Sequence, residues 1–154
     1  MERINRWHYN SGKPNRFARV LNAISAWIYK LRFTPDLVDT LEITGRVSGK
    51  PVQMPIVVVH LDGAEYIVSM LGAHTNWVKN LRAADGHAAL LKGGRRSIRL
   101  LDVPVAERAP ILKRYCEIAP AGRVHIPVEP SAAFADFANI ANEYPVFRIE
   151  IDEN

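Results

Sequence analysis

A short glycine-bounded turn between two strand-like segments is the feature that most constrains this chain. Residues 41–51 read LEITGRVSGKP, so Arg46, Ser48 and Lys50 surround a turn that holds two glycines. Glycine permits positive φ and a close approach of the backbone to a ligand. Successive backbone N–H groups in such a turn form a concavity that binds anions. The segment therefore predicts either an anion clamp or an ordinary solvated hairpin.

Length and cysteine content narrow the class of protein. A chain of 154 residues suits one domain. The single cysteine, Cys116, excludes an internal disulfide, suits a reducing compartment, and is expected to be a small buried residue. The chain shows no apolar segment typical of a signal peptide and no apolar run near the roughly 20 residues of a spanning helix. We therefore expect a cytoplasmic protein, at most peripheral to the inner face of the membrane.

Positive charge is concentrated at the start of the chain. The formal net charge is +4, and residues 1–32 hold seven basic side chains against Glu2 alone. The rest of the chain is not basic, which argues against nucleic-acid binding. Apolar residues recur at helical spacing over 15–31, and this helix could pack on the body, lie on an anionic membrane or cover a ligand pocket. We predict a basic arm over 1–35 and a cofactor-binding domain over 36–154.

Apolar periodicity and turn residues predict an α+β domain with a mainly antiparallel sheet. Strands are expected over 37–44, 52–61, 65–71, 88–92, 97–103 and 146–151. Further helices are expected over 77–84, 107–118 and 131–142, with Asn76 and Ser131 as N-caps of the first and last. Hairpin turns are expected at Asp62-Gly63 and over 93–96. Six short strands with helices at the edges indicate a small barrel.

Four segments combine anion-binding and apolar features. They are the turn at 45–50, the strand 52–56, the segment 69–73 and the helix that follows Asn76. We expect the two strand segments to pair around the Asp62-Gly63 turn, with the cationic turn next to one of them. The helix N-terminus after the other would add a further anion site. Together they predict a groove with apolar walls and a positive end, suited to a planar ring system with a phosphate tail.

This pattern resembles the deazaflavin-dependent nitroreductases, which are also called F420H2-dependent quinone reductases. The matching residues are Gly45, Arg46, Ser48, Gly49, Pro55, Ile56, Asp62, Gly63, Gly72, Trp77, Asn80, Leu81 and Ala83. The resemblance covers about residues 37–151, and the order and spacing of these residues carry it rather than any single motif. It implies a mainly antiparallel six-stranded split β-barrel, similar to flavin reductases, with peripheral helices.

The resemblance also implies coenzyme F420 as the cofactor, its phosphate and polyglutamate tail lying at the turn after the first strand. The implied cofactor-binding residues are Arg46, Ser48, Gly49, Lys50, Met54, Pro55, Ile56, Ser69, Leu71, Gly72, Ala73, Trp77 and Asn80. Trp77 could equally be a core residue. The implied reaction is hydride transfer from reduced F420 to an electron-poor acceptor such as a quinone, an enone or a nitro compound. No catalytic residue and no metal ligand is assigned, because the cofactor carries the chemistry.

Two departures from the best-known members bear on the acceptor. The loop between Met70 and Trp77 is short, and tyrosines expected near the substrate are missing from 119–125. These departures put a nitroimidazole-reducing activity in doubt. His74 and His125 are the candidates on the substrate side, and His74 could donate a proton near neutral pH or simply be exposed.

Two other functions remain open at the level of sequence. One is an FMN-binding oxidoreductase on the same barrel, although Arg95 and Arg96 in a second hairpin favour a longer basic track for a polyglutamate tail. The other is a non-catalytic protein that sequesters a cofactor or lipid through a basic membrane arm. Apolar barrel edges make a homodimer the expected assembly.

Overall fold

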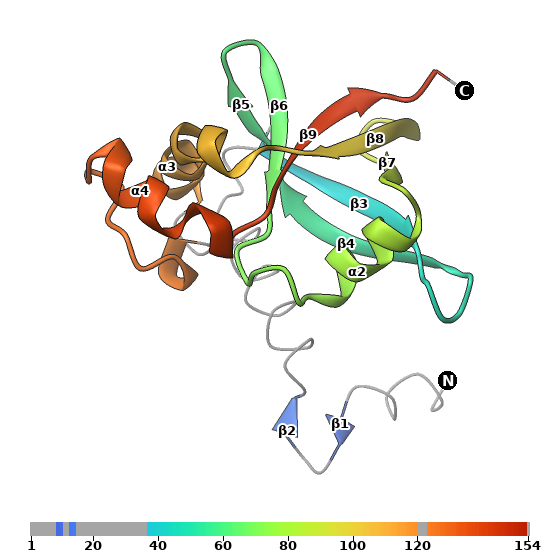
Figure 1. Cartoon of the computed structure of the whole chain (residues 1–154). Coiled ribbons are helices and arrows are strands. Elements are labelled where there is room, and N and C mark those ends of the chain that lie inside the picture. Colours follow the sequence, from blue (N-terminus) through green and yellow to red (C-terminus); the bar gives the residue numbers. More distant parts are fainter. Residues whose placement is uncertain (1–8, 11–12, 15–36, 120–122, 154) are drawn as a thin grey trace.

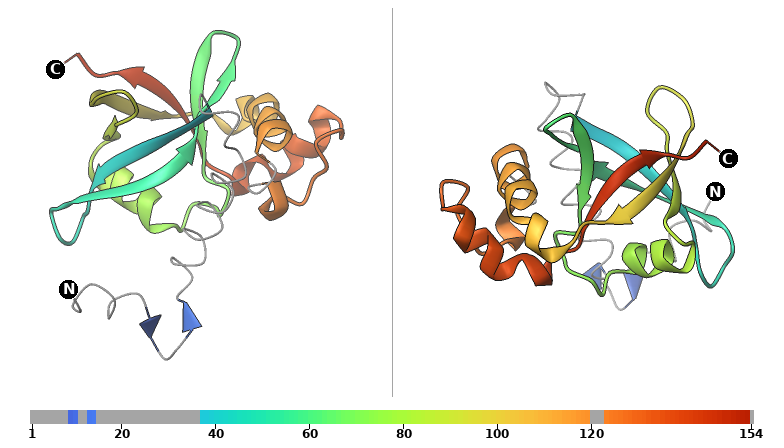
Figure 2. Two further views of the ribbon diagram at one scale, coloured as in Figure 1. Left: turned by 180° about the vertical axis from the view of Figure 1, so that it is seen from behind. Right: turned by 45° about the horizontal axis from the view of Figure 1, so that its top comes forward.

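The computed structural model of the chain describes residues 9–10, 13–14, 37–119 and 123–153. A curled sheet forms its centre, and α3 (Ala109–Ile118) and α4 (Phe134–Ile140) lie together beside one end of that sheet (Figures 1 and 2). Helix α2 (Asn76–Ala83) lies apart from these two and contacts β3 (Val38–Thr44). Within the described ranges, no helix has the length and apolar character needed to cross a bilayer. The predicted helix over 15–31 falls outside the described residues.

Seven strands form the sheet in the order β4-β3-β7-β8-β9-β6-β5, and every neighbouring pair is antiparallel. The other six strands are β4 (Pro51–Val57), β5 (Val59–Leu61), β6 (Ala64–Val68), β7 (His87–Leu90), β8 (Arg96–Asp102) and β9 (Val146–Ile151). A separate two-stranded pair joins β1 (Tyr9–Asn10) to β2 (Lys13–Pro14). The predicted α+β class and the predominance of antiparallel pairing are confirmed.

The predicted count of six strands is wrong, because the segment expected to be one strand over 52–61 is two. Strand β4 ends at Val57, which pairs with Val38 of β3, whereas β5 starts at Val59, which pairs with Tyr66 of β6. Val58 lies between them and donates its N–H to the Leu37 carbonyl at 2.8 Å. Since β4 and β5 are the two edges of the sheet, one continuous segment connects both edges and the sheet must curl into a half-barrel.

The strand break leaves no local mark in the sequence. Residues 56–59 form an uninterrupted run of buried β-branched side chains, which favours extended backbone throughout. The change of partner at Val58 instead depends on where β3 and β6 lie in space. It also corrects the expected pairing around Asp62-Gly63, since that turn joins β5 to β6 while β4 pairs with β3.

The three predicted helices within the described ranges are present, but their starts differ from expectation. Thr75, with extended φ and ψ, occupies the N-cap of α2 in place of Asn76, and Ala133 occupies that of α4 in place of Ser131. Short 3₁₀ segments flank the longer helices: η2 (Val105–Glu107), η3 (Arg123–His125) and η4 (Ala141–Glu143). Asn76 is already helical, and its side chain serves a tertiary contact described below.

Two apolar clusters hold these elements together. One lies between the helices and the sheet and includes Leu112, Cys116, Phe137 and Val146. The other lies inside the curl of the sheet beneath α2 and is centred on buried residues such as Leu41. Cys116 is buried as expected, and burial raises the pKa of its thiol to about 11, so the thiol stays protonated at neutral pH.

Candidate functional site

The turn over 45–50 is closed by its own backbone. Gly45 donates its N–H to the Lys50 carbonyl at 2.8 Å, and Gly49 donates to the Gly45 carbonyl at 2.9 Å. Gly49 has φ +68°, which favours glycine. The Ser48 hydroxyl accepts the Lys50 N–H at 3.2 Å and is therefore used inside the turn. The turn is thus a defined structure with Arg46 and Lys50 exposed on it.

Arg46 connects this turn to α2. Its Nη1 donates to Asn80 Oδ1 at 2.7 Å, and its backbone N–H donates to the same oxygen at 3.2 Å. Its Nη2 donates to Asn76 Oδ1 at 3.3 Å. Asn80 is only 7% exposed, so its position in the helix is fixed by packing. The Gly-Arg and Trp-x-x-Asn motifs, far apart in the sequence, therefore form one unit.

The N-terminus of α2 carries a polar atom with no partner. Thr75 Oγ1 is buried and makes no hydrogen bond within the described residues, so Thr75 occupies the N-cap position without a capping bond from its side chain. The first turn of α2 contains no acidic side chain, so the partial positive charge of the helix end is not offset there. Sequence reasoning missed Thr75, although a threonine directly before a helix is a typical N-cap residue.

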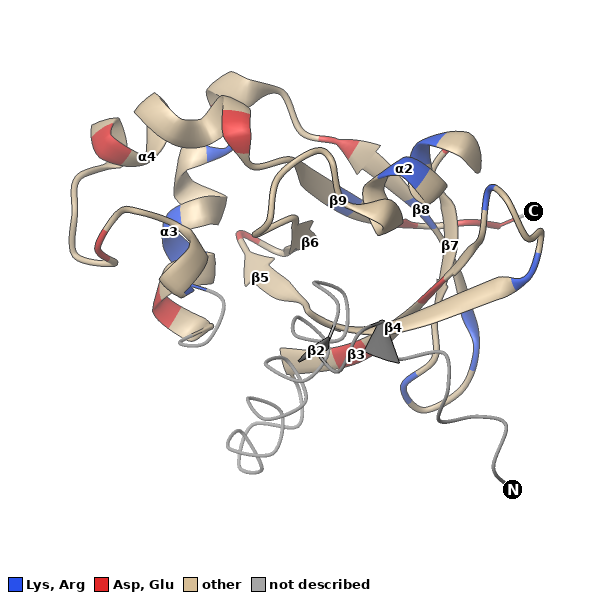
Figure 3. Ribbon diagram, turned by 90° about the horizontal axis from the view of Figure 1, so that it is seen from below, with Lys and Arg blue, Asp and Glu red and all other residues tan. Residues whose placement is uncertain are grey.

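Turn and helix end together fit an anionic group. A hydroxyl without a partner, a helix N-terminus and a turn with two cations lie on elements that are hydrogen-bonded to each other. Figure 3 shows basic residues on both the β3–β4 turn and α2 at this side of the molecule. These are donors that phosphate and carboxylate oxygens require. The residues present therefore suit the phosphate-bearing tail of a cofactor.

The predicted ring-binding residues divide between the core and the surface. Ile56 is buried in the cluster beneath α2, and Met54 packs on that cluster. Met54 and Pro55 are both partly exposed. Strand β4 pairs with β3 and also contacts β6, the strand that precedes the loop with the other predicted ring-binding residues. In that loop, Leu71 and Ala73 are exposed.

Ser69 and Gly72 define the shape of this loop. Ser69 is 1% exposed, and its hydroxyl donates to the Gly72 carbonyl at 2.6 Å. Gly72 returns a hydrogen bond from its N–H to the Ser69 carbonyl at 3.1 Å and has φ +91°. The Ser69 hydroxyl is therefore engaged within the loop, where it supports the exposed residues.

Trp77 has a packing role. Its ring meets that of Phe147 edge to face, with centroids 5.5 Å apart and planes at 65°. Trp77 also packs on the cluster beneath α2 while remaining partly exposed. It thus anchors the first turn of α2 to the sheet, whichever ligand lies next to it.

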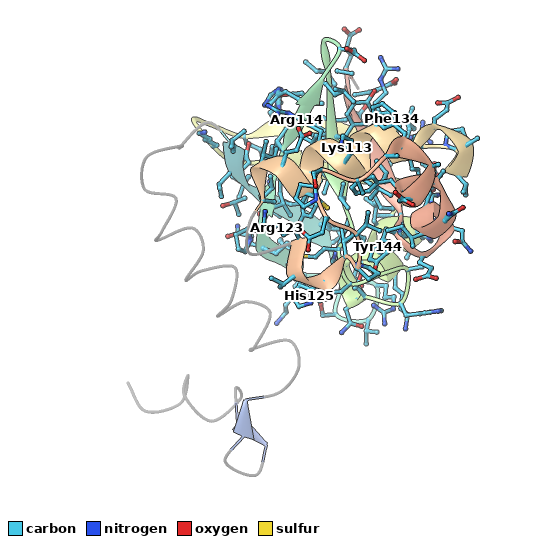
Figure 4. The ribbon with its side chains drawn as sticks, turned by 90° about the vertical axis from the view of Figure 1, so that its left-hand side faces the viewer. Lys113, Arg114, Arg123, His125, Phe134 and Tyr144 are labelled. Atoms are coloured by element: carbon cyan, nitrogen blue, oxygen red, sulfur yellow. The ribbon has the colours of Figure 1, made fainter. Side chains whose placement is uncertain are left out.

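His125 lies on a different element from the other predicted site residues. It lies in η3 on the helical side, where its carbonyl accepts the Tyr144 hydroxyl at 2.9 Å, and Figure 4 shows it beside Tyr144 and Arg123. His74 is exposed in the loop before α2, directly adjacent to Thr75. Of the two substrate-side candidates, His74 is the one on the same loop as the predicted ring-binding residues.

Arg95 and Arg96 do not extend the basic turn. Leu91 donates its N–H to the Thr40 carbonyl at 3.1 Å, so the hairpin over 93–96 lies at the opposite end of β3 from Gly45. Arg95 also pairs with Glu42, and hydrogen bonds from Arg95 and Gln53 lower the pKa of that carboxyl. These arginines therefore do not continue a tail-binding track from the 45–50 turn.

Two surface hollows lie away from these residues. One, of about 460 Å³, is lined by Asp39, Val58, His60, Glu65 and residues 92–96. The other, of about 300 Å³, lies between the end of α2 and β8 and includes the Arg82–Asp102 and Arg99–Asp85 ion pairs. Neither contains a residue predicted to bind the cofactor. The charges in the second hollow are paired with each other, which is typical of surface structure.

Comparison with known proteins gives one family match and several likenesses to solved structures. A sequence model described as F420H(2)-dependent quinone reductase matches residues 18–126. The solved structure of Atu2129 from Agrobacterium tumefaciens, of unknown function, aligns at 13% identity with a TM-score of 0.52, over 76% of this chain and 51% of that one. The structure of an F420-H2 dependent reductase, FDR-A, aligns at 21% identity with a TM-score of 0.46, over 75% and 95%.

These likenesses differ in what they establish. The chain spans about half the length of the Agrobacterium protein, and an alignment at that identity establishes a shared fold alone. No curated protein matches the chain. The family match extends from before β3 to the end of η3 and so covers more than half of the chain. It is therefore the finding that indicates the chemistry.

Proposed function

We propose that this chain, which belongs to the F420H(2)-dependent quinone reductase family, catalyses hydride transfer to an electron-poor acceptor such as a quinone, an enone or a nitro compound. The protein is an oxidoreductase, and its cofactor is coenzyme F420. The observation that carries the proposal is the contact of the 45–50 turn with α2 through Arg46, which donates to Asn76 at the helix N-terminus and to Asn80 one turn further on. This contact supports a site for an anionic cofactor tail.

In this proposal the chain holds the tail by charge and by hydrogen bonds. Lys50 and Arg46 face the phosphate and glutamate carboxylates, while Ser48 and Gly49 maintain the turn. Asn80 orients Arg46, and Trp77 anchors the helix whose N-terminus meets the phosphate. The hydroxyl of Thr75 donates to the same phosphate group, which would satisfy the one buried side-chain oxygen left without a partner in the described part of the chain.

The ring lies against apolar side chains in the same proposal. The strand 54–56, with Met54 and Ile56 on one face and Pro55 on the other, would border the ring on one side, and the loop with Ser69, Leu71, Gly72 and Ala73 would border it on the other. Bound reduced F420 supplies the hydride. The chain contributes orientation of the two reactants and exclusion of water from their contact, and holding reacting atoms in place accounts for several kcal/mol of a barrier. His74 or His125 would then lie toward the acceptor.

The split-barrel assignment belongs to the same proposal. Strands β4 and β5 are the two edges of the sheet and are joined at Val58. This connection supports the assignment, because a barrel requires the two edges of its sheet to come together. We further propose that the basic residues 1–32 attach the enzyme to an anionic membrane surface and that the enzyme works as a homodimer.

Titration of tryptophan fluorescence with coenzyme F420 tests the proposed binding mode. We expect saturable quenching by F420 and an affinity about five- to thirtyfold weaker for Lys50→Ala, since a charge-assisted contact to an anion contributes on the order of 1–2 kcal/mol. Arg114→Ala is the matched control, because Arg114 is an exposed cation on α3 that pairs with Glu117. It should leave the affinity unchanged.

Other outcomes of this titration point to other functions. Preferential binding of FMN would contradict the proposal and indicate an FMN-binding oxidoreductase. Tight binding of F420 without turnover of any quinone, enone or nitro acceptor would indicate a sequestering protein. Equal loss of affinity in the Lys50 and Arg114 variants would show that overall charge, and not the turn, attracts the cofactor.

A further inference from the structure

A buried arginine on the helical side of the molecule makes contacts that the proposed reaction does not use directly. Arg108, in the N-cap position of α3, is 8% exposed. Its Nε donates to the Val103 carbonyl at 2.8 Å, and its Nη1 donates to the carbonyls of Ala141 at 3.0 Å and Tyr144 at 3.4 Å. All three of these acceptors are backbone oxygens.

Burial of an arginine costs free energy unless hydrogen bonds compensate the lost solvation of its guanidinium group. Burial lowers the pKa of Arg108, because water no longer solvates the guanidinium group. An apolar side chain of similar volume would fill this position without that desolvation. What it would lack is the planar set of donors that joins the segment after β8 to residues 141–144, which lie more than thirty positions further along the chain.

The segment that Arg108 holds supports the loop of the proposed ring site. Ser69 donates its N–H to the Pro145 carbonyl at 2.9 Å. At Gly72, an added Cβ would lie 3.4 Å from the Glu143 carbonyl oxygen, so the loop backbone runs directly over this segment. The position of loop 69–73 is therefore determined by residues 141–145, and the position of those residues depends on Arg108.

Helix α3 reaches the same loop by a second contact. The Tyr115 hydroxyl donates to Met70 Sδ at 3.1 Å, and Tyr115 is buried in the cluster between the helices and the sheet. Burial raises the pKa of Tyr115, so its hydroxyl keeps the proton that it donates. Helix α3 thus contacts loop 69–73 through Tyr115, and through Arg108 it contacts the segment that supports this loop.

We propose that Arg108 is a positioning residue for the F420-dependent reaction. It holds residues 141–145 in the place from which they fix loop 69–73 against the cofactor ring, and it does not touch the cofactor itself. This inference rests on the proposed role of loop 69–73 in ring binding. A loop that moves by about an ångström would lose both affinity and rate, because hydride transfer depends on close approach.

Hydrogen exchange of the protein without cofactor tests the mechanical half of this inference. In Arg108→Met and Arg108→Lys, we expect exchange of the Ser69 and Gly72 amides to accelerate about tenfold or more, the loss typical of a hydrogen bond to a charged group. The Leu100 amide, bonded to the Gly86 carbonyl at 2.8 Å, is the internal reference and should change far less. Equal acceleration of all three amides, or no change, would overturn the inference.

Cofactor titration and steady-state kinetics test the functional half. Arg108→Met should weaken F420 binding and lower kcat by about tenfold each, with Arg108→Lys in between, since lysine keeps the charge but not the planar donors. Ile98→Val is the control, because Ile98 is fully buried in the other cluster. If Arg108→Met does not fold, the lysine variant carries the comparison. Activity of the Arg108 variants equal to that of Ile98→Val would refute the positioning role.

The two measurements separate this inference from the proposed function. Failure of the wild-type protein to bind F420 would refute the proposed function and the cofactor part of the inference. The exchange experiment would still decide whether Arg108 fixes loop 69–73, because it needs no cofactor.

Discussion

At Gly45 the available space decides which residue the position accepts. An added Cβ would lie 2.7 Å from Ser48 Oγ and 3.3 Å from both the Lys50 carbonyl oxygen and Val52 Cγ2. Contacts below 3.0 Å do not occur in relaxed structures, so alanine there must displace the Ser48 hydroxyl. That hydroxyl accepts the Lys50 N–H, and the turn would lose this bond together with its shape.

Gly45→Ala should therefore lower the free energy of unfolding by about 1–3 kcal/mol, the usual cost of a steric conflict in a packed site. It should also weaken F420 binding, because the turn carries Arg46 and Lys50. Chemical denaturation and fluorescence titration measure the two effects. Adding Ser48→Ala removes the closest contact and should recover part of the stability; a double variant as unstable as the sum of the two single variants would contradict this explanation.

At the level of elements, the contact between the β3–β4 turn and α2 is the feature that assembles the candidate site. Asn80 Oδ1 accepts two hydrogen bonds from Arg46, one from the side chain and one from the backbone. Because Asn80 is buried while Arg46 is exposed, the helix is the fixed partner and the turn is held against it.

A double-mutant cycle on Arg46→Ala and Asn80→Ala should reveal this coupling. We expect Asn80→Ala to destabilise the protein by about 1–3 kcal/mol and the two substitutions to couple by about 1 kcal/mol, since both remove the charge-assisted bond from Arg46 Nη1 to Asn80 Oδ1. Urea denaturation of the four proteins measures both quantities. Additivity within about 0.3–0.5 kcal/mol would show that the two side chains act independently.

Element boundaries also show where local patterns stop being informative. Strand β9 begins and ends where its alternation predicts, at Val146 and Ile151. The start of α2 was less predictable, because Asn76 and Thr75 are both good N-caps. Thr75 occupies the N-cap, and the carbonyl and side chain of Asn76 instead accept hydrogen bonds from the Arg46 guanidinium.

For the whole molecule, the basic arm raises the question of attachment. Residues 1–32 carry seven basic side chains against one acidic one, and the net charge of the chain is +4. Electrostatic attraction to anionic lipid contributes about 1 kcal/mol for each basic residue near the surface and weakens with salt. A segment of this charge could attach the protein to a membrane without any spanning helix.

Removal of residues 1–32 should therefore abolish binding to vesicles that contain anionic lipid, while vesicles of neutral lipid bind neither form of the protein. Cosedimentation at low and high salt measures this association, and F420 titration of the shortened chain shows whether the rest still folds and binds. Unchanged sedimentation after the deletion would exclude the arm as the attachment site.

The chain's local patterns determined those features that depend on neighbouring residues. The tight turns at 45–50 and Asp62-Gly63 follow from glycine, and the extents of β3 and β9 follow from their strand-like residues, because backbone preferences act over a few positions. Cys116 was likewise expected to be buried from its place in a helical pattern. These predictions agree with the structure.

Only the tertiary structure decided which of these pieces meet. The change of partner at Val58 depends on the positions of β3 and β6, and nothing in a run of β-branched residues marks it. Arg46 reaches Asn80 across 34 positions and Arg108 reaches Ala141 across 33. The separation of Arg95 from the 45–50 turn is set by the pairing of β3 with β7. Contacts of this kind arise from the packing of whole elements, so no local pattern encodes them.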